Sequence, residues 1–542
     1  MAQGGMIPSA FHCSAAIGAC RKRSHWPLAV QMLAFMEQQR SPPNVLCFNL
    51  ALGCGTTPAA ARLLLRTMQQ WVLCPDIISF RTALGSCERV ADWEEALSLF
   101  EEMDMAKVLP DQRCYTALIR ALGRQDLWDR ALQAFAEMRT GGPTSDQIAY
   151  CCTMDVCEKS GHWECSLQLL QTLKEDSLMP DVQSYGSAIS ACDTGAAWES
   201  AVGLLAEMEE AAVVPNAVAA SAALSAAETS GAWQVCLALM CSLQQWRLPA
   251  TALQAASAAN ALRRVKGQEA AWHLLEAVRD KWRREAGADP SVSDELEGAG
   301  WSSPGVLARG AGVAALSKPS GRSSEAILDE LSGRLGVRLE SVSRLDFPTS
   351  GVLPVALGDM ASVAFKWIQA QFAARLVEKD YLCLVEGPAL GPVGAEGCIE
   401  LPLRDVAGSM GRSEVVAHGR PARTEFRVLE RFAGLQGQGD ELMLLRVRLL
   451  TGRRHQIRVH FAAIGRHVVG DLTYGRRWQS CLPYCPRLWL HCERIELRDL
   501  QGHQFIASAP LPEELEVVLS QLGPIASEAG GADGVEKSEN SS

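Results

Sequence analysis

The stretch from Ile77 to Asp111, IISFRTALGSCERVADWEEALSLFEEMDMAKVLPD, is one copy of a unit that recurs through the first half of the chain. Tryptophan marks the same place in successive copies, as Trp26, Trp93, Trp128, Trp163, Trp198 and Trp233. Four of the five gaps are 35 residues, and the gap of 67 is two units with about three residues deleted. A fixed period of this length predicts stacked repeats instead of one globular core.

Each unit is predicted to be a pair of helices. Alignment on tryptophan gives units 10–44, 45–76, 77–111, 112–146, 147–181, 182–216 and 217–251, with a degenerate eighth to about 286. Apolar residues such as Ala96, Leu97 and Met103 follow Trp93 at steps of three and four, which marks one stripe of a helix. Pro-Asp or Pro-Asn closes most units, since proline cannot continue a helix. One pair cannot bury its apolar face, so we predict an all-α solenoid over residues 10–286, with tryptophan as a packing residue.

Length, net charge, cysteine spacing and apolar runs limit the classes of protein to which this chain can belong. At 542 residues the chain has room for two or more domains, and a net charge of −11 argues against undirected attraction to nucleic acid. The 19 cysteines lack zinc-finger spacing, and several recur at one helical position, which favours reduced, buried thiols inside a cell. No apolar run is long enough to span a membrane. The first residues show neither a signal peptide nor an Arg-rich presequence, so we expect a cytosolic or nuclear protein or an incomplete start.

The second half of the chain does not repeat. Residues 287–310 are rich in Gly, Ser, Pro and acids and are predicted to be a flexible linker; residues 523–542 are predicted to be a disordered tail. Between them, residues 311–522 form the predicted catalytic domain. They contain β-rich runs at 379–386, 424–430, 442–450 and 488–498 and one clear helix at 360–377. This pattern predicts an α+β domain with a mainly antiparallel sheet.

Two segments of this domain carry candidate chemistry. Ser343 to Gly351 places Asp346 beside Arg344, just before a Thr-Ser-Gly turn. Thr451 to His460 begins at a strand end and continues as a helix. The stretch between Leu444 and Arg494 contains about ten arginines but only two acidic residues. It is predicted to form a local basic patch, made of Arg453, Arg454, Arg466, Arg476 and Arg477. Such a patch suits phosphates. Taken alone, however, the carboxylate could cap a turn and the arginines could form a solvated face.

The 35-residue helical unit, ending in Pro-Asp or Pro-Asn and carrying Tyr or Phe near its start, resembles the pentatricopeptide (PPR) repeat. The resemblance implies binding of single-stranded RNA at about one base per repeat, read by two or three side chains. In that family the readers are the fifth residue of the first helix and the last residue of the unit. Here they pair as Ser14 with Asn44, Asn49 with Asp76, Arg81 with Asp111, Thr116 with Asp146, Cys151 with Asp181, Gly186 with Asn216, and Ser221 with Thr251.

The family's code would read Asn/Asp as favouring uracil, Thr/Asp guanine and Ser/Asn adenine. Arg81, Cys151, Gly186 and Thr251 depart from that code, so no target sequence is predicted. The alternative is a protein-binding solenoid of the tetratricopeptide kind, whose period is 34 residues. The period of 35 and the acidic or amide residue at the end of each unit favour the PPR interpretation.

The two chemical segments, in this order, resemble the RluA-type pseudouridine synthases. That family has His-Arg-Leu-Asp-x-x-Thr-Ser-Gly, then Lys-x-Tyr-x-Ala-x-Val-x-Gly, then Gly-Arg-Thr-His-Gln-Ile-Arg-Val-His. The chain supplies counterparts at Arg344–Gly351, Lys379–Gly387 and Gly452–His460, and further landmarks at Lys318–Gly321, Val469–Gly475 and Leu490–His491. It departs from the pattern at Ser343, where the family has His, and at Arg454, where it has Thr.

The resemblance implies that Asp346 acts as nucleophile or electrostatic partner while a uracil ring is detached, turned and rejoined. It further implies that Arg458 pairs with Asp346 and keeps it ionised, and that Tyr381 stacks on the uracil and assists removal of the C5 proton. The remaining candidates for RNA contact are Arg344, Arg453, Arg454, His455 and Gln456. The reaction is an isomerisation, so no redox cofactor or metal is called for.

The sequence thus predicts a fusion enzyme: a PPR array that helps to select an RNA, and a tethered synthase domain that isomerises a uridine. RNA is the expected partner, with no membrane and no metal. One alternative is an RNA-binding protein with impaired catalysis, signalled by Ser343; another is a protein-binding scaffold that carries an independent synthase domain. PPR resemblance alone suggests a mitochondrion or plastid, and neither the class of RNA nor the compartment follows from the sequence.

Overall fold

The computed structural model describes residues 10–22, 25–38, 42–141, 146–287, 305–406, 411–417, 419–433, 441–475, 482 and 485–523. The chain forms two compact units, Met1–Pro249 and Ala250–Ser542. Each unit is considered by itself. In the part of the chain that the structure describes, no helix has both the length and the apolar character needed to cross a membrane.

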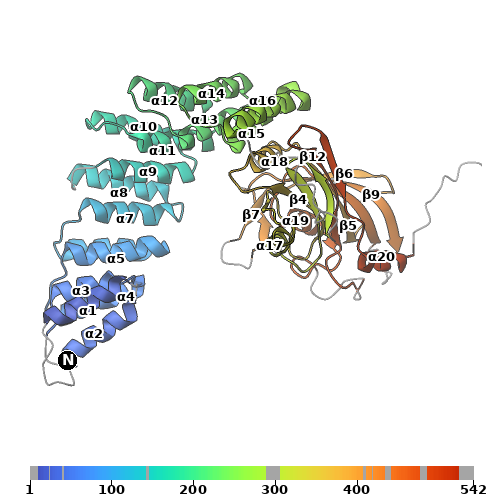
Figure 1. Ribbon diagram of the computed structural model, residues 1–542. Helices are drawn as coiled ribbons and strands as arrows, with labels where there is room; N and C mark the ends of the chain where they lie inside the picture. Colours follow the sequence, from blue (N-terminus) through green and yellow to red (C-terminus); the bar gives the residue numbers. More distant parts are fainter. Residues whose placement is uncertain are drawn as a thin grey trace, which may run out of the picture. The chain divides into compact units, whose positions relative to one another are not determined.

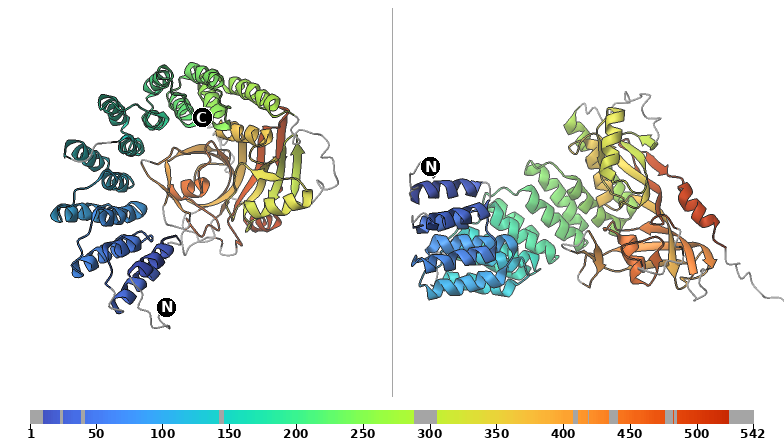
Figure 2. Two further views of the ribbon diagram at one scale, coloured as in Figure 1. Left: turned by 60° about the vertical axis from the view of Figure 1, so that its left-hand side comes forward. Right: turned by 90° about the horizontal axis from the view of Figure 1, so that it is seen from below.

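The described residues of the first unit are helical and fall into pairs, one pair for each predicted repeat. The pairs lie side by side in one row, coloured blue to green in Figures 1 and 2. The helices are α1 (Ala10–Lys22), α2 (Trp26–Gln38), α3 (Val45–Leu52), α4 (Pro58–Gln70), α5 (Ile77–Val90), α6 (Trp93–Met105), α7 (Gln112–Gly123), α8 (Trp128–Gly141), α9 (Gln147–Lys159), α10 (Trp163–Glu175), α11 (Val182–Thr194), α12 (Trp198–Glu210), α13 (Ala217–Thr229) and α14 (Trp233–Gln245). The predicted helix pairs are confirmed.

The recurring apolar residues pack these pairs together. Met36, Met103, Met138 and Met208, which share one place in the repeat, are all fully buried. The tryptophans are half-buried and contact the next repeat: the ring of Trp128 lies 3.8 Å from that of His162, and the guanidinium of Arg130 lies 5.1 Å from the ring of Trp93. The tryptophan period therefore follows from contacts between neighbouring repeats.

The last residue of each unit begins the next. The side chains of Asn44, Asp76, Asp111, Asp146, Asp181, Asn216 and Thr251 each accept the backbone N–H three residues ahead, as N-caps of α3, α5, α7, α9, α11, α13 and α15 (Ala252–Lys266). Asp76 also forms a capping box with Ser79. Such a cap contributes about 0.5–2 kcal/mol to helix stability. The Pro-Asp pair is thus a stop signal followed by a start signal.

The second unit is built on a mixed, mainly antiparallel sheet, as predicted. Its path runs β1-β2-β4-β12-β5-β10-β9-β6, with β3, β11 and β13 at the side, and within the described residues only β4 and β12 pair in parallel. The strands are β1 (Val306–Gly310), β2 (Val313–Lys318), β3 (Leu339–Ser341), β4 (Ser350–Leu357), β5 (Glu378–Gly387), β6 (Glu396–Glu400), β7 (Leu403–Asp405), β8 (Ser413–Val415), β9 (Arg423–Ala433), β10 (Glu441–Leu449), β11 (His467–Val468), β12 (Leu490–Arg498) and β13 (Gln504–Ser508).

Helices cover both faces of this sheet. Along β5, Cys383 belongs to a large apolar core and Leu384 to a smaller one, so the two cores lie on opposite faces. The large core takes in residues of α17 (Ser324–Leu335), α18 (Val363–Ala373) and α19 (Gln456–Ala463). The smaller core is closed by α20 (Glu513–Ser520).

The eighth helix pair, α15 (Ala252–Lys266) and α16 (Gln268–Ala286), belongs to this second compact unit, whereas the sequence had placed it at the end of the solenoid. It packs on α18: the rings of Trp272 and Trp367 lie 6.3 Å apart, and Arg498 forms an ion pair of 2.7 Å with Glu276. Both tryptophans are buried, so the eighth pair shares a core with α18, in agreement with the boundary at Pro249.

The structure describes only part of the predicted linker and tail. Residues 306–310 of the predicted linker form β1, because Val306, Ala308, Arg309 and Gly310 pair with β2. The rest of the linker from residue 288, and the predicted tail from residue 524, lie outside the described residues.

Candidate active site

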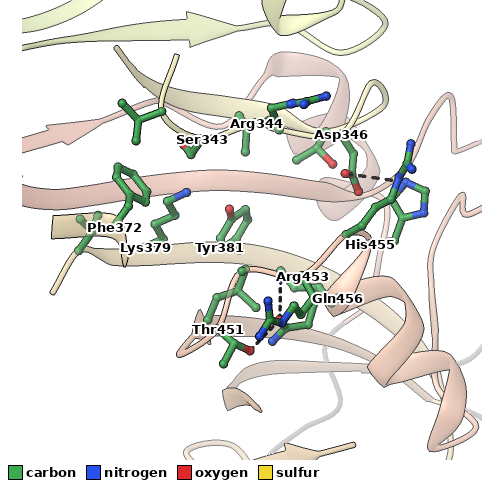
Figure 3. Close-up of a pocket in the computed structure, with 18 of the residues that line it drawn as sticks. Ser343, Arg344, Asp346, Phe372, Lys379, Tyr381, Thr451, Arg453, His455 and Gln456 are labelled. Carbon is green, nitrogen blue, oxygen red and sulfur yellow. Dashed lines mark hydrogen bonds and ion pairs between the residues drawn. The ribbon is translucent and has the colours of Figure 1, made fainter. Parts of the chain in front are cut away.

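Asp346 (Figure 3) lies on the loop between β3 and β4, and the buried side chain of Lys318 holds that loop. Lys318, at the end of β2, is 1% exposed, and its Nζ donates to the carbonyls of Asp346 (3.1 Å), Phe347 (3.3 Å), Thr349 (2.8 Å) and Pro319 (3.3 Å). Burial lowers the pKa of Lys318 to about 8, against the opposing charge of Asp346. The main chain around Asp346 is therefore tied to the end of a core strand.

The Thr-Ser-Gly turn after Asp346 is fixed by the parallel pairing of β4 with β12. Gly351 has a φ of +125°, and a Cβ there would overlap the backbone of Cys492, so glycine is required. The hydroxyl of Ser350 lies 2.9 Å from Nδ1 of His491 and accepts a hydrogen bond of 3.0 Å from Arg487. Two landmarks that are far apart in sequence thus support one loop.

The carboxylate of Asp346 lies between two side chains from the segment after β10. Its Oδ1 is 3.8 Å from Nε2 of His455 (Figure 3), and its Oδ2 is 3.6 Å from Nη1 of Arg458. Burial lowers the pKa of His455, while the charge of Asp346 opposes that shift. The predicted proximity of Asp346 and Arg458 is present in the structure.

Asp471 orients Arg458. It accepts two hydrogen bonds from Arg458, at 2.7 and 2.8 Å, and the two side chains are 1% and 5% exposed. Burial alone would raise the pKa of Asp471, but the hydrogen bonds and charge of Arg458 hold it below its ordinary value. Because Nε and Nη2 of Arg458 are occupied by Asp471, Nη1 is the nitrogen directed at Asp346.

Sequence reasoning gave Asp471 and Tyr474 no role at the site, although both lie in the landmark from Val469 to Gly475. Tyr474 places its ring 5.1 Å from the guanidinium of Arg458, and its hydroxyl lies 3.0 Å from Nδ1 of His455. The same hydroxyl accepts the N–H of Ser413. The landmark could have signalled this role, but the partners become visible only in three dimensions.

Tyr381 and Lys379 project from the same face of β5, two residues apart. Both line the cleft that contains Asp346 (Figure 3). Tyr381 is 5% exposed, and burial raises its pKa well above the ordinary value. The ammonium of Lys379 lies 4.5 Å from the ring of Phe372, and burial lowers its pKa to about 8.

Gln456 supports the basic segment from inside. It is 2% exposed, and its Oε1 accepts from the Thr451 hydroxyl (2.8 Å) and the Arg453 N–H (3.0 Å), while its Nε2 donates to the Arg423 carbonyl (3.0 Å) and the Thr424 hydroxyl (2.9 Å). Its amide is thus engaged within the protein. We assign it to positioning the segment, in place of the RNA contact expected from the sequence.

The predicted arginines differ in exposure. Arg344 and Arg454 are exposed, and Arg453 is half-buried. Arg466 is 1% exposed and donates to the Glu441 carbonyl, so it is not part of a surface patch. Arg476 and Arg477 lie outside the described residues.

Several of the predicted site residues line one cleft of about 1430 Å³. It holds the predicted residues Asp346, Tyr381, Arg458, Arg344, Arg453, Arg454, His455 and Gln456. Eight of its lining residues are Arg or Lys and four are Asp or Glu, although the whole chain carries a net charge of −11. The cleft therefore offers local positive charge beside a carboxylate.

The predicted base-reading residues of the first unit differ in accessibility. The Asn49 amide donates to Asp76 at 3.1 Å, and Arg81 forms an ion pair of 3.4 Å with Asp111, so both predicted pairs are in contact. The half-buried or exposed predicted readers are Asn44, Asn49, Asp76, Arg81, Asp111, Thr116, Asp146, Asp181, Asn216, Ser221 and Thr251; Ser14, Cys151 and Gly186 are buried. Cys151 lies 3.5 Å from the Ser184 hydroxyl, and burial raises its pKa to about 11.

Comparison with known proteins follows the same division of the chain. Residues 303–463 match the family model described as RNA pseudouridylate synthase. Residues 76–249 match the model described as the pentacotripeptide-repeat region of PRORP. The first match contains Asp346, Tyr381 and Arg458, and the second contains most of the described repeats.

Two curated relatives and one solved structure illustrate the similarity. The dual-specificity RNA pseudouridine synthase RluA of Salmonella typhi is 35% identical over 194 residues, which are 34% of this chain and 82% of the relative. An uncharacterized RNA pseudouridine synthase of Chloroflexus aurantiacus is 40% identical over 184 residues, 33% of this chain and 52% of the relative. Human RNA Pseudouridylate Synthase Domain Containing 1 has 25% identity and a TM-score of 0.34, over 42% of this chain and 91% of that chain.

The chain spans about half the length of the first curated relatives that it matches, 52% and 50%. The match to the Salmonella typhi relative is more complete, at 82% of its length. That coverage, at 35% identity, places the chain in the family of RluA-type RNA pseudouridine synthases.

Proposed function

We propose that the protein isomerises uridine to pseudouridine in RNA through Asp346, and that the repeats of its first unit help to select the RNA. The supporting observation is the position of the Asp346 carboxylate. It lies on a loop held by Lys318, 3.6 Å from Arg458, in a positively charged cleft that Tyr381 also lines.

The geometry suits the bond changes of this reaction. The N1–C1′ bond of uridine breaks, a C5–C1′ bond forms, C5 loses a proton and N1 gains one, so the composition of the nucleotide is unchanged. An ionised carboxylate can hold the detached fragment as a nucleophile. Arg458 lies 3.6 Å from that carboxylate, and Asp471 keeps the guanidinium in place beforehand, so little reorganisation is needed during the reaction.

Tyr381 is proposed to stack on the uracil. Its ring lines the cleft, and its raised pKa keeps the phenol protonated at neutral pH. A protonated phenol is a poor base, so this state favours stacking over removal of the C5 proton. A uridine inside a helix must first be flipped out, at a cost of a few kcal/mol. Phosphate contacts along the cationic cleft would offset that cost.

The repeats are proposed to supply part of the selectivity. Residues 76–249 match a PPR-type family model, and two predicted reading pairs are in contact at the surface of the first unit. A scaffold that binds only protein would leave the choice of uridine to the synthase domain alone. A protein with impaired catalysis would bind RNA without converting it.

Tritium release from RNA that carries [5-³H]uridine tests the proposal, because loss of the C5 proton accompanies each turnover. Asp346→Asn in the full chain should lower the rate by about 10⁴-fold or more, as loss of a nucleophile does. Its affinity for RNA should stay within a few-fold of wild type. Asp329→Asn makes the same change at an exposed residue of α17 and should leave the rate unchanged.

Near wild-type release by Asp346→Asn would overturn the assignment of this residue. Absence of release by the wild-type protein on ribosomal, transfer and messenger RNA pools, with the circular dichroism of a folded chain, would instead favour the impaired RNA-binding protein.

A further inference from the structure

The helix pair α15–α16 forms part of the wall of the catalytic cleft. The last turn of α15 carries Arg263, Arg264 and Lys266, and Arg263 lines the cleft together with Gln268, the first residue of α16. The eighth unit therefore brings the basic side chain of Arg263 to the rim of the site that holds Asp346.

The contact between α15 and α18 is specific. Asn260, one turn before Arg263, is 4% exposed, and its Nδ2 donates to the carbonyl of Ala373 at 3.1 Å. Ala373 ends α18, and Arg375 follows two residues later with a φ of +56°. Asn260 thus joins the two helix ends, and both Arg263 and Arg375 line the cleft.

Two arginines of the cleft wall, Arg375 and Arg453, and Arg420 near them have no ion-paired carboxylate in the described part of the chain. Burial first, and then the charges of Arg420 and Arg375, lower the pKa of Arg453. Nε of Arg453 is buried and has no hydrogen-bond partner. Clustered like charges with an unsatisfied donor are unfavourable until an anion lies between them.

The eighth unit also lacks the features of a base reader. Ala256 stands at the fifth position of α15, where other units carry residues such as Asn49 or Thr116, and it is 2% exposed. A buried alanine offers no hydrogen bond to a base edge. The residue of α15 that lines the cleft is instead Arg263, a cation of its last turn.

We propose that α15–α16 is an RNA-backbone-binding arm of the catalytic unit, in which Arg263 with Arg375 and Arg453 holds a phosphate of the substrate beside the target uridine. The proposal rests on the proposed function, since it names the part of the RNA that this rim binds. It assigns the eighth unit to placing the substrate in the cleft, a role distinct from base reading by the repeats before it.

Kinetics of tritium release by the full chain test this role. Arg263→Gln should raise KM by about tenfold, because RNA binding loses one charge-assisted hydrogen bond. The effect on kcat should be smaller. The slope of log KM against log salt concentration should fall by about 0.7, because one phosphate contact is lost. Arg263→Lys should restore most of that slope. Arg284→Gln, on the exposed end of α16 and away from the cleft, is the matched control and should behave as wild type.

Equal KM and salt slope for Arg263→Gln, Arg284→Gln and wild type would overturn the proposal. If Arg263→Gln lowers the melting temperature, Arg375→Gln provides the same measurement from the α18 side of the rim. Binding of a fluorescein-labelled hairpin RNA to Asp346→Asn, with and without Arg263→Gln, measures the phosphate contact without turnover. Loss of that contact can therefore be distinguished from failure of the isomerase proposal.

Discussion

Lys318 holds the loop that carries Asp346 through its buried ammonium group. One ammonium donates to four main-chain carbonyls, three of them in the loop that carries Asp346. The neutral amine has fewer donors and no charge, so it cannot satisfy the same set. The protonation state of Lys318 should therefore control how firmly Asp346 is held.

We expect activity to fall as the pH rises through about 8, because burial lowers the pKa of Lys318 to about 8. The rate of tritium release, measured from pH 6 to 10, should drop by about tenfold per pH unit on the alkaline side. Lys318→Met should release tritium slowly at every pH, and its rate should not fall further on the alkaline side, so it lacks the alkaline limb of the profile. Lys379→Met is the control, since the pKa of Lys379 is also lowered to about 8; it should retain the limb.

Stability should change in the opposite direction over this range. The folded-state pKa of about 8 lies below the ordinary value of 10.5, so the unfolded chain binds more protons between those pH values. The contribution of Lys318 to the free energy of unfolding therefore rises with pH through that window. A fall in melting temperature that tracked the fall in rate, and persisted in Lys318→Met, would contradict this account.

At the same scale, the sequence identifies some site residues and not others. Asp346, Tyr381 and Arg458 follow from motif order, because they stand in the three segments that resemble the synthase family. The bidentate contact between Arg458 and Asp471 does not follow, since it joins α19 to the segment after β11. Gln456 looked like an RNA contact in a basic segment, and only its burial shows that its amide is satisfied internally.

At the scale of the element, the end of one repeat performs two tasks. Asp76 caps α5 by accepting the N–H of Ser79 at 2.9 Å, and it also accepts from the Asn49 amide at 3.1 Å. Burial alone would raise the pKa of Asp76, but the hydrogen bonds from Ser79 and Asn49 hold it below its ordinary value. The same carboxylate is therefore both a helix start and a predicted base reader.

Two substitutions of Asp76 should separate these tasks. Asp76→Asn keeps a good N-cap and should leave the melting temperature nearly unchanged, while Asp76→Ala should cost about 0.5–2 kcal/mol of stability. Both should weaken the preference for uracil at one position of a bound RNA, measured with oligonucleotides that differ only there. Unchanged base preference in Asp76→Asn would remove this residue from the reading pairs.

Element types were predictable where the pattern is local. The 35-residue period predicts the helix pairs from α1–α2 to α13–α14, and alternation predicts β5, β9, β10 and β12 within a few residues. The partner of α15–α16 was not predictable, because an amphipathic helix pair has the same pattern whether it packs on another repeat or on α18. Trp272 and Asn260 reveal the partner only through their tertiary contacts.

At the scale of the whole molecule, charge is distributed unevenly. The chain carries a net charge of −11, yet the cleft beside Asp346 has eight basic and four acidic lining residues. Since salt screens charges beyond roughly 8–10 Å, local clusters decide where an RNA phosphate binds. Attraction of RNA to this protein should therefore be confined to the cleft and to any patches on the repeats.

The repeat array ends at residue 286 in the sequence-based prediction and at Pro249 in the structure. The two boundaries predict different behaviour of truncated chains. Residues 250–542 keep α15–α16 on α18, whereas residues 287–542 expose Trp367 and strip Arg498 of its partner Glu276. We expect the longer fragment to unfold cooperatively and to release tritium from a short hairpin substrate. The shorter fragment should melt at a lower temperature or aggregate, because a buried aromatic surface becomes exposed. Equal melting temperatures for the two fragments would show that the eighth helix pair adds nothing to the catalytic unit.

The longer fragment also tests selection by the repeats. If the longer fragment modified the same uridines as the full chain in a mixed RNA pool, the repeats would have no part in selection.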